Sequence, residues 1–335
     1  MRRSPFSICS ARNDNQLDNA RAGHGDLRMT LLLFVEQFLN GMQFGVFLFL
    51  ISAGLTLVLG IMNVVNLAHG SLYMLGAYFA STFFGLTGSL IVALVLMIPV
   101  MLVVGMVIEL VVLRTMYERD HMDQVLATFG LILFFNELVR LIWGVDAQPL
   151  TLPVWLSGNV EILPDAPYPV YRLVVIGVGM AVAAGLFWII TKTRMGMLIR
   201  AGASNRPMVG ALGVNIRFLY TMVFGLGAVF AGLAGLMAAP LQSVESGMGE
   251  EMLIFAFVVI VIGGIGSIRG ALVASIVIGI FETVGRSILP FLMLEIVDSE
   301  TAQTAGPALA SMLVYILMAV ILFFKPQGLF PARTG

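Results

Sequence analysis

Long apolar runs recur along the chain and constrain its fold more than any other feature. The runs at 38–61, 89–113 and 171–191 are each long enough to cross ~30 Å of hydrocarbon as a helix. Further apolar runs lie at 124–143, 216–240, 252–263, 271–289 and 307–324. Because lipid offers no partner to backbone polar groups, helices are the simplest way to cross it. We therefore predict an all-α polytopic membrane protein with about 8–10 transmembrane helices, nine being the central estimate, since 38–85 and 250–290 are interrupted.

The composition agrees with this fold class and excludes others. The chain of 335 residues is 59% hydrophobic and 11% charged, whereas soluble domains are about 25% charged. The net charge of −1 gives no reason to expect nucleic-acid binding. One cysteine, Cys9, excludes a disulfide framework, and the three histidines are too scattered to suggest a metal site.

The first 28 residues differ from the rest. Residues 1–28 are polar, mixed in charge and without the apolar run that a secretory signal needs. Met29 begins a more membrane-like sequence, so it is a candidate for the true start of translation. We expect the transmembrane domain to occupy 30–330.

The charges of the loops predict which side of the membrane each loop faces. Lysine and arginine gather in the loop at 114–123, in a segment at 192–217 and at the C-terminus. The loops at 144–169, 241–251 and 295–305 contain neither residue. Basic loops stay cytoplasmic, so the C-terminus is expected in the cytoplasm. The loop at 144–169 is expected outside, where five prolines stiffen it rather than allowing a helix.

The basic segment between two spans is the most distinctive polar stretch. It carries Lys192, Arg194, Arg200, Arg206 and Arg217 without an acidic residue. Residues 200–213 can form a short amphipathic helix whose small residues would let another protein dock. The alternative is an ordinary basic loop that only sets the topology.

Two interrupted stretches, 59–80 and 262–282, resemble each other loosely. Each ends an apolar run with Gly-Ile, crosses a small polar patch and resumes after a glycine. Interrupted segments at corresponding places in two halves point to a transport site in transporters built from repeats. Candidate pathway residues are Asn63, Asn66, His69, Ser71, Gly264, Gly266 and Ser267. The alternative is that these residues are helix ends at the membrane surface, capped by asparagine and serine.

Charges within the apolar runs are arranged so that they neutralise each other. Glu137 and Arg140 are three residues apart, and Glu282 and Arg286 are four apart, which places each pair on one helix face. Both pairs are expected near span ends, as interfacial anchors. Glu109, close to a cytoplasmic end, is expected to extend toward the surface.

Four motifs, in order, resemble those of branched-chain amino acid ABC permeases. The first has Gly60, Ile61, Asn66, Ala68, His69, Gly70, Met74, Gly76 and Tyr78. The second has Thr193, Arg194, Gly196, Arg200, Ala201, Asn205, Ala211, Gly213 and Asn215. The third has Gly263, Gly264, Gly266, Ser267 and Gly270, with Arg269 where the family is expected to carry proline. The fourth is KPQGLF at 325–330.

This resemblance implies the permease subunit of an importer in the bacterial inner membrane, which moves a small amino acid into the cytoplasm. It implies as partners a second, M-type permease, two cytoplasmic ABC ATPases and a periplasmic substrate-binding protein. Relatives in this group also carry urea, amides or other small acids, so the solute stays open. The segment at 192–215 would couple to the ATPases through Arg194, Gly196, Arg200, Ala201, Asn205, Ala211 and Gly213.

Two other function classes fit the sequence less well. Neither Lys192 nor Lys325 lies in a P-loop motif, so ATP would be bound by partners and no cofactor by this chain. An ion-coupled transporter or channel is the alternative, and its signature would be an unpaired carboxylate deep in a span. An intramembrane enzyme is disfavoured because H-E-x-x-H and G-x-S-x-G are missing from the sequence.

Overall fold

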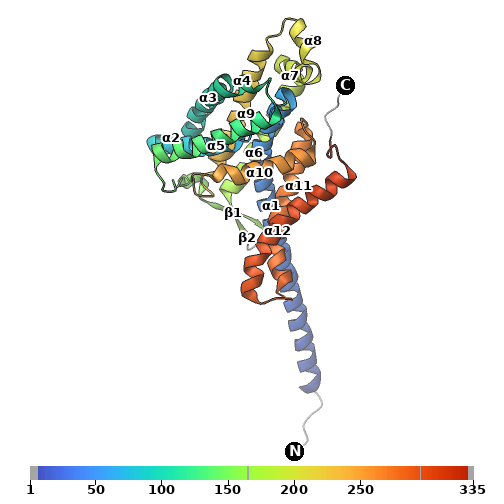
Figure 1. Ribbon diagram of the computed structural model, residues 1–335. Helices are drawn as coiled ribbons and strands as arrows, with labels where there is room; N and C mark the ends of the chain where they lie inside the picture. The colour runs from blue at the N-terminus through green and yellow to red at the C-terminus, as the bar shows by residue number, and fades with distance from the viewer. Residues whose placement is uncertain (1–6, 164–165, 295, 331–335) are drawn as a thin grey trace, which may run out of the picture.

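Helices make up most of the described residues, as the computed structural model in Figure 1 shows. The structure describes residues 7–163, 166–294 and 296–330, without the side chains of 7–31, 163, 166 and 206. Of the polar segment at 1–28, residues 1–6 lie outside this description, and its separation from the domain at 30–330 stays a prediction. The α-helices are α1 (Ser7–Met62), α2 (His69–Thr87), α3 (Leu90–Ile108), α4 (Arg114–Met116), α5 (His121–Trp143), α6 (Val170–Lys192), α7 (Arg194–Ser204), α8 (Arg206–Ala211), α9 (Ile216–Ala238), α10 (Met248–Gly263), α11 (Ile268–Met293) and α12 (Ser299–Phe324).

Two helices form the centre of the molecule. In α1 and α9 the apolar window is 83% buried, whereas in the other candidate spans it is 11–28% buried. Glycines allow the close packing: a Cβ on Gly54 of α1 would lie 2.6 Å from the carbonyl oxygen of Gly227 in α9. A Cβ on Gly76 of α2 would lie 2.2 Å from the Cα of Gly232 in α9. Small residues at such contacts let helix backbones approach within a membrane.

Within the described residues, seven helices are long and apolar enough to cross a membrane, fewer than the nine expected. The difference lies at the two interruptions. After the first, α2 has 19 residues but begins with a polar turn. Before the second, α10 has only 16 residues, which extend roughly 24 Å. The interruptions themselves are confirmed, since helices break at 63–68 and at 264–267.

The proline-rich loop at 144–169 contains both β-strands of the described residues. Strand β1 (Asn159–Leu163) pairs antiparallel with β2 (Ala166–Pro169), after a 3₁₀ turn at Val154–Leu156. Elsewhere in this loop, Gln148 forms a bridge with Val244 of the loop before α10. The expectation that this loop is not helical is confirmed, apart from that one turn, whereas its stiffening by proline stays a prediction.

The basic segment forms two helices, so the single helix expected at 200–213 is wrong. Asn205 is extended, with φ −149° and ψ 90°, and separates α7 from α8. Its side chain accepts a hydrogen bond from the N–H of Met208 at 3.1 Å, as an N-cap does. A proline in the first turn of α8 is compatible with a helix start at this place.

Candidate functional site

The first turn of α2 lies deep among the helices. Nε2 of His69 is 3.1 Å from the carbonyl oxygen of Ile51, well before α1 ends at Met62. The chain therefore turns back after α1, through Asn63 at φ 54°, a left-handed conformation that asparagine tolerates better than most residues. Asn66, His69 and Ser71 are almost fully buried, with 0%, 1% and 5% exposure.

The starts of α2 and α10 meet through two glycines. A Cβ on Gly70 would lie 2.3 Å from the carbonyl oxygen of Gly249. Because Gly70 and Gly249 have no side chains, the N-termini of α2 and α10 can contact each other directly. Beside the contact lies a small open depression between α2, α5 and α10, lined among others by Leu67, Ser71, Ile132, Asn136, Glu250 and Leu253. We call it the α2–α10 pocket.

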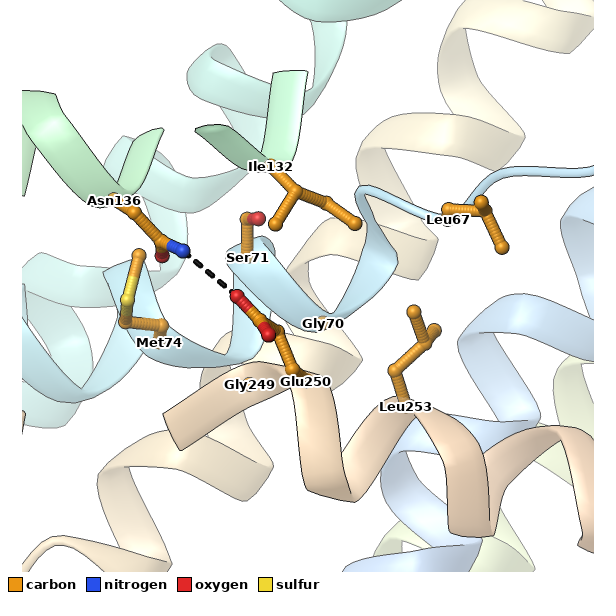
Figure 2. A pocket seen from close by; sticks show the side chains of 9 residues that line it. All are labelled: Leu67, Gly70, Ser71, Met74, Ile132, Asn136, Gly249, Glu250 and Leu253. Atoms are coloured by element: carbon orange, nitrogen blue, oxygen red, sulfur yellow. Dashed lines mark hydrogen bonds between the residues drawn. The ribbon is translucent and has the colours of Figure 1, made fainter. Parts of the chain in front are cut away.

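Asn136 and Glu250 lie on one side of the α2–α10 pocket, beside Met74. Figure 2 shows the amide of Asn136 and the carboxylate of Glu250 facing each other, with Leu67 and Leu253 on the opposite side. Nδ2 of Asn136 donates to Oε1 of Glu250 at 2.8 Å. Sequence reasoning missed this pair, because Glu250 belonged to an apparent acidic loop and nothing in the sequence joins it to Asn136.

Neither helix that begins at the α2–α10 pocket has a capping side chain. The N-cap of α2 is Ala68 and that of α10 is Gly247, and no side chain accepts from their first-turn N–H groups. By contrast, Asn215 caps α9 and Asp298 caps α12. A buried helix start without a cap leaves N–H donors that need another partner, and the helix dipole adds positive potential there.

The glycine-rich break at 264–267 does not line the α2–α10 pocket. The expected pathway residues therefore fall into two groups. Gly264, at φ 102°, packs against the C-terminal segment, since its Cβ would lie 2.8 Å from the carbonyl oxygen of Phe330. A Cβ on Gly60 would lie 2.9 Å from the Cα of Gly266. Ser267 caps α11 by accepting from the N–H of Gly270 at 3.1 Å. The two interruptions therefore meet through glycine backbones, and of the seven expected residues only Ser71 lines the α2–α10 pocket.

Helices α7 and α8 lie at one end of the molecule, beyond the ends of α1 and α9 (Figure 1). Most of the residues expected to couple to an ATPase are exposed there: Arg194, Arg200, Asn205, Ala211 and Gly213. Met197, Met208 and Leu212 are also exposed, by 55%, 62% and 76%. The surface thus combines positive charge with apolar side chains.

Two of the expected coupling residues are less accessible. Ala201 is half-buried and Gly196 is buried. A Cβ on Gly196 would lie 2.2 Å from the carbonyl oxygen of Ile190, so this glycine lets α7 fold back on the end of α6. A larger residue at 196 would disturb that turn directly, and it is therefore a poor probe of a surface contact.

A buried polar cluster joins the end of α3 to the start of α9. Glu109 opens a π-helical segment, Glu109–Leu113, and its side chain is fully buried. It pairs with Arg114 at 3.1 Å and accepts from the hydroxyls of Tyr117 and Thr221. Burial, followed by the hydrogen bond to Glu109, raises the pKa of Tyr117, which stays a donor. The expectation that Glu109 extends to the surface is wrong.

The two expected ion pairs are confirmed, but one lies in an unexpected place. Arg140 bonds Glu137 at 2.8 Å, and Arg286 bonds Glu282 at 2.5 Å. Glu137 and Arg140 are exposed, whereas the Glu282 residue is only 2% exposed and accepts a further bond from Ser311 of α12. Because α11 continues to Met293, Glu282 is inside the helix and links two helices.

Comparisons with known proteins point to one family. The family model described as "Branched-chain amino acid transport system / permease component" matches residues 37–322. The high-affinity branched-chain amino acid transport system permease protein BraD of Pseudomonas aeruginosa is 27% identical over 310 residues, covering 88% of this chain and 95% of BraD. The permease protein LivH of Escherichia coli is 30% identical over 273 residues, covering 77% and 88%. No solved structure matches the chain.

Proposed function

Since this chain belongs to the family of branched-chain amino acid transport system permease components, we propose that it is the permease subunit of an ATP-driven importer. It moves a small amino acid of the leucine, isoleucine and valine class into the cytoplasm across a bacterial inner membrane. The names of its relatives BraD and LivH support the solute class. Its partners are a second, M-type permease, two cytoplasmic ABC ATPases and a periplasmic substrate-binding protein.

The observation that carries this proposal is the exposed surface of α7 and α8. A terminal surface of arginines and large apolar side chains suits a soluble protein partner better than lipid. Short connections join α7 to α6 and α8 to α9, so a partner that pushes on these helices would move two membrane helices. Energy from ATP hydrolysis would enter the permease by this route.

The distribution of basic residues supports the proposed orientation. Arg200 lies in α7, Lys192 and Arg217 lie on either side of α7 and α8, and Arg114 reaches the start of α9 through Thr221 at 2.9 Å. The guanidinium carbon of Arg269 lies 5.0 Å from the centroid of the Phe187 ring, near the end of α6. Basic residues concentrated at one end of a membrane protein favour that end as cytoplasmic.

Co-purification of the ATPases with charge-reversal variants tests the proposal. Arg200→Glu reverses the charge of the α7–α8 surface, and we expect the ATPases to detach while the chain stays in the membrane. Arg140→Glu, at an exposed arginine of α5, is the matched control and should retain them. Undiminished ATPase recovery with Arg200→Glu would contradict the coupling role.

Uptake by the reconstituted assembly tests the source of energy. We expect leucine uptake into proteoliposomes that needs ATP and persists when ion gradients are dissipated. Uptake that needs an ion gradient and ignores ATP would instead establish the ion-coupled alternative.

A further inference from the structure

We propose that the C-terminal segment, Lys325–Phe330, positions the break between α10 and α11, so that movement of α7 and α8 reaches α10 and the buried start of α2. The inference rests on the proposed function, because it assumes that ATPase partners move α7 and α8. It gives a role to the fourth sequence motif, KPQGLF, which the proposed function leaves unused.

The C-terminal segment completes the end of α10. The last carbonyl groups of a helix have no partner within that helix. Here the N–H of Leu329 donates to the carbonyl oxygen of Ile262 at 2.8 Å. The N–H of Phe330 donates to the carbonyl oxygen of Gly263 at 3.0 Å, and the side chain of Leu329 packs against the buried core. Residues that follow α12 therefore hold the end of α10 in place.

Two glycines with left-handed backbones make this contact possible. Gly328 has φ 81° and Gly264 has φ 102°, a region that residues with a side chain rarely adopt. A Cβ on Gly328 would lie 2.6 Å from the Cα of Gly264. A Cβ on Gly264 would lie 2.8 Å from the carbonyl oxygen of Phe330. A larger residue at 328 would therefore push the C-terminal segment away from the break.

The same break contacts the helices that lead to α7. A Cβ on Gly60, near the end of α1, would lie 2.9 Å from the Cα of Gly266. At the start of α11, the guanidinium of Arg269 lies over the ring of Phe187, near the end of α6. Because only one residue separates α6 from α7, a force on α7 reaches the break through Phe187 and Arg269.

Helix α10 connects this break with the buried start of α2. A Cβ on Gly249, in the first turn of α10, would lie 2.0 Å from the carbonyl oxygen of Gly70. The 16 residues of α10 contain no proline, so this helix moves as one piece. Displacing its end at the break therefore displaces the first turn of α2, because packed contacts of this kind shift between discrete arrangements.

The ratio of leucine imported to ATP hydrolysed tests the proposal in the complete assembly, reconstituted in proteoliposomes. Gly328→Ala places a methyl group against Gly264. We expect the ratio to fall about five-fold, the lower end of coupling between distant sites, while the ATPases stay bound and still hydrolyse ATP. A smaller amount of folded complex would lower both rates together and leave their ratio unchanged.

Gly88→Ala is the matched control. Gly88 also has a left-handed backbone, with φ 67°, but nothing lies within 4 Å of an added Cβ. This variant should therefore keep the ratio of the unchanged chain. An equal fall in both variants would mean that backbone strain, and not the contact with the break, lowers the ratio.

Hydrogen exchange of the unchanged complex supplies a second readout, which decides alone if Gly328→Ala does not assemble. We compare the nucleotide-free complex with the complex trapped by ATP and vanadate. Peptides covering 262–267 and 325–330 should exchange at different rates in the two states, because the break moves with the ATPases. A segment that only stabilises the end of α10 would give the same rates in both states.

The outcomes separate this inference from the proposed function. If the complex imports leucine with ATP while Gly328→Ala keeps the ratio, or while exchange in both segments ignores the nucleotide, the role of the C-terminal segment is wrong and the importer stands. If the unchanged complex shows no import that depends on ATP, the proposed function and this inference both fail.

Discussion

At the scale of single residues, the buried carboxylate of Glu109 depends on three neighbours. Arg114, Tyr117 and Thr221 all donate to it, and Thr221 comes from another helix. A buried ion pair contributes modestly as a whole, but removing one partner leaves an uncompensated charge. The π-helical segment beginning at Glu109 is a local departure from α-geometry, of the kind often found at functional places.

Removing Arg114, the cation of this cluster, should therefore destabilise the folded chain. Arg114→Met is expected to lower the free energy of unfolding by about 3–5 kcal/mol, because the Glu109 carboxyl group stays buried without its cationic partner. Thermal unfolding in detergent measures the change. Arg140→Met removes an exposed partner and should cost about 0–1 kcal/mol. Equal losses in the two variants would contradict the importance of burial.

Glycine contacts give a second test at this scale. Gly76→Ala places a methyl group against Gly232, and overpacking of this kind costs about 1–3 kcal/mol. Gly85→Ala, in the same helix, meets nothing within 4 Å and is the matched control. We expect the temperature of thermal unfolding to fall for Gly76→Ala alone. An equal fall for Gly85→Ala would mean that the tight contact at Gly76 does not determine the stability.

At the scale of elements, the break between α7 and α8 depends on one capping side chain. Asn205→Ala removes the acceptor for the N–H of Met208, a change that typically costs ~1 kcal/mol of helix stability. We expect faster hydrogen exchange in α8, followed by weaker retention of the ATPases. Asn205→Asp keeps a capping oxygen and should behave like the unchanged chain. Fraying confined to α7 would contradict this assignment.

The two interrupted stretches, 59–80 and 262–282, resemble each other in sequence but differ in how their helices begin. The break at 63–68 lets α2 begin beside Ile51 of α1, well before that helix ends, and the first turn of α2 is buried without a capping side chain. The break at 264–267 is closed by Gly264, by the cap from Ser267 and by the C-terminal segment. The capping alternative therefore describes the second break; at the first, Asn66 accepts from the N–H of Ala68, but no side chain caps the first turn of α2.

At the scale of the whole molecule, α1 and α9 organise the packing while the other spans surround them. The proposed orientation can be tested on this scale with single cysteines, after Cys9→Ser removes the chain's one cysteine. A membrane-impermeant maleimide added outside intact spheroplasts should label Ser157→Cys, in the proline-rich loop. It should label Arg200→Cys only after the membrane is opened. The reverse pattern would overturn the orientation.

The sequence alone determined the features that depend on neighbours along the chain. Apolar length predicted most helices, Asn63 and the glycines near 264 predicted the breaks, and i,i+3 or i,i+4 spacing predicted both ion pairs. Tertiary structure decided what depends on distant partners: Asn136 with Glu250, Glu109 with Thr221, and the shortness of α10. Hydrophobic patterns record which residues avoid water, but they do not record which helices touch. In this chain those contacts are set by glycines, whose packing partners lie far away in the sequence.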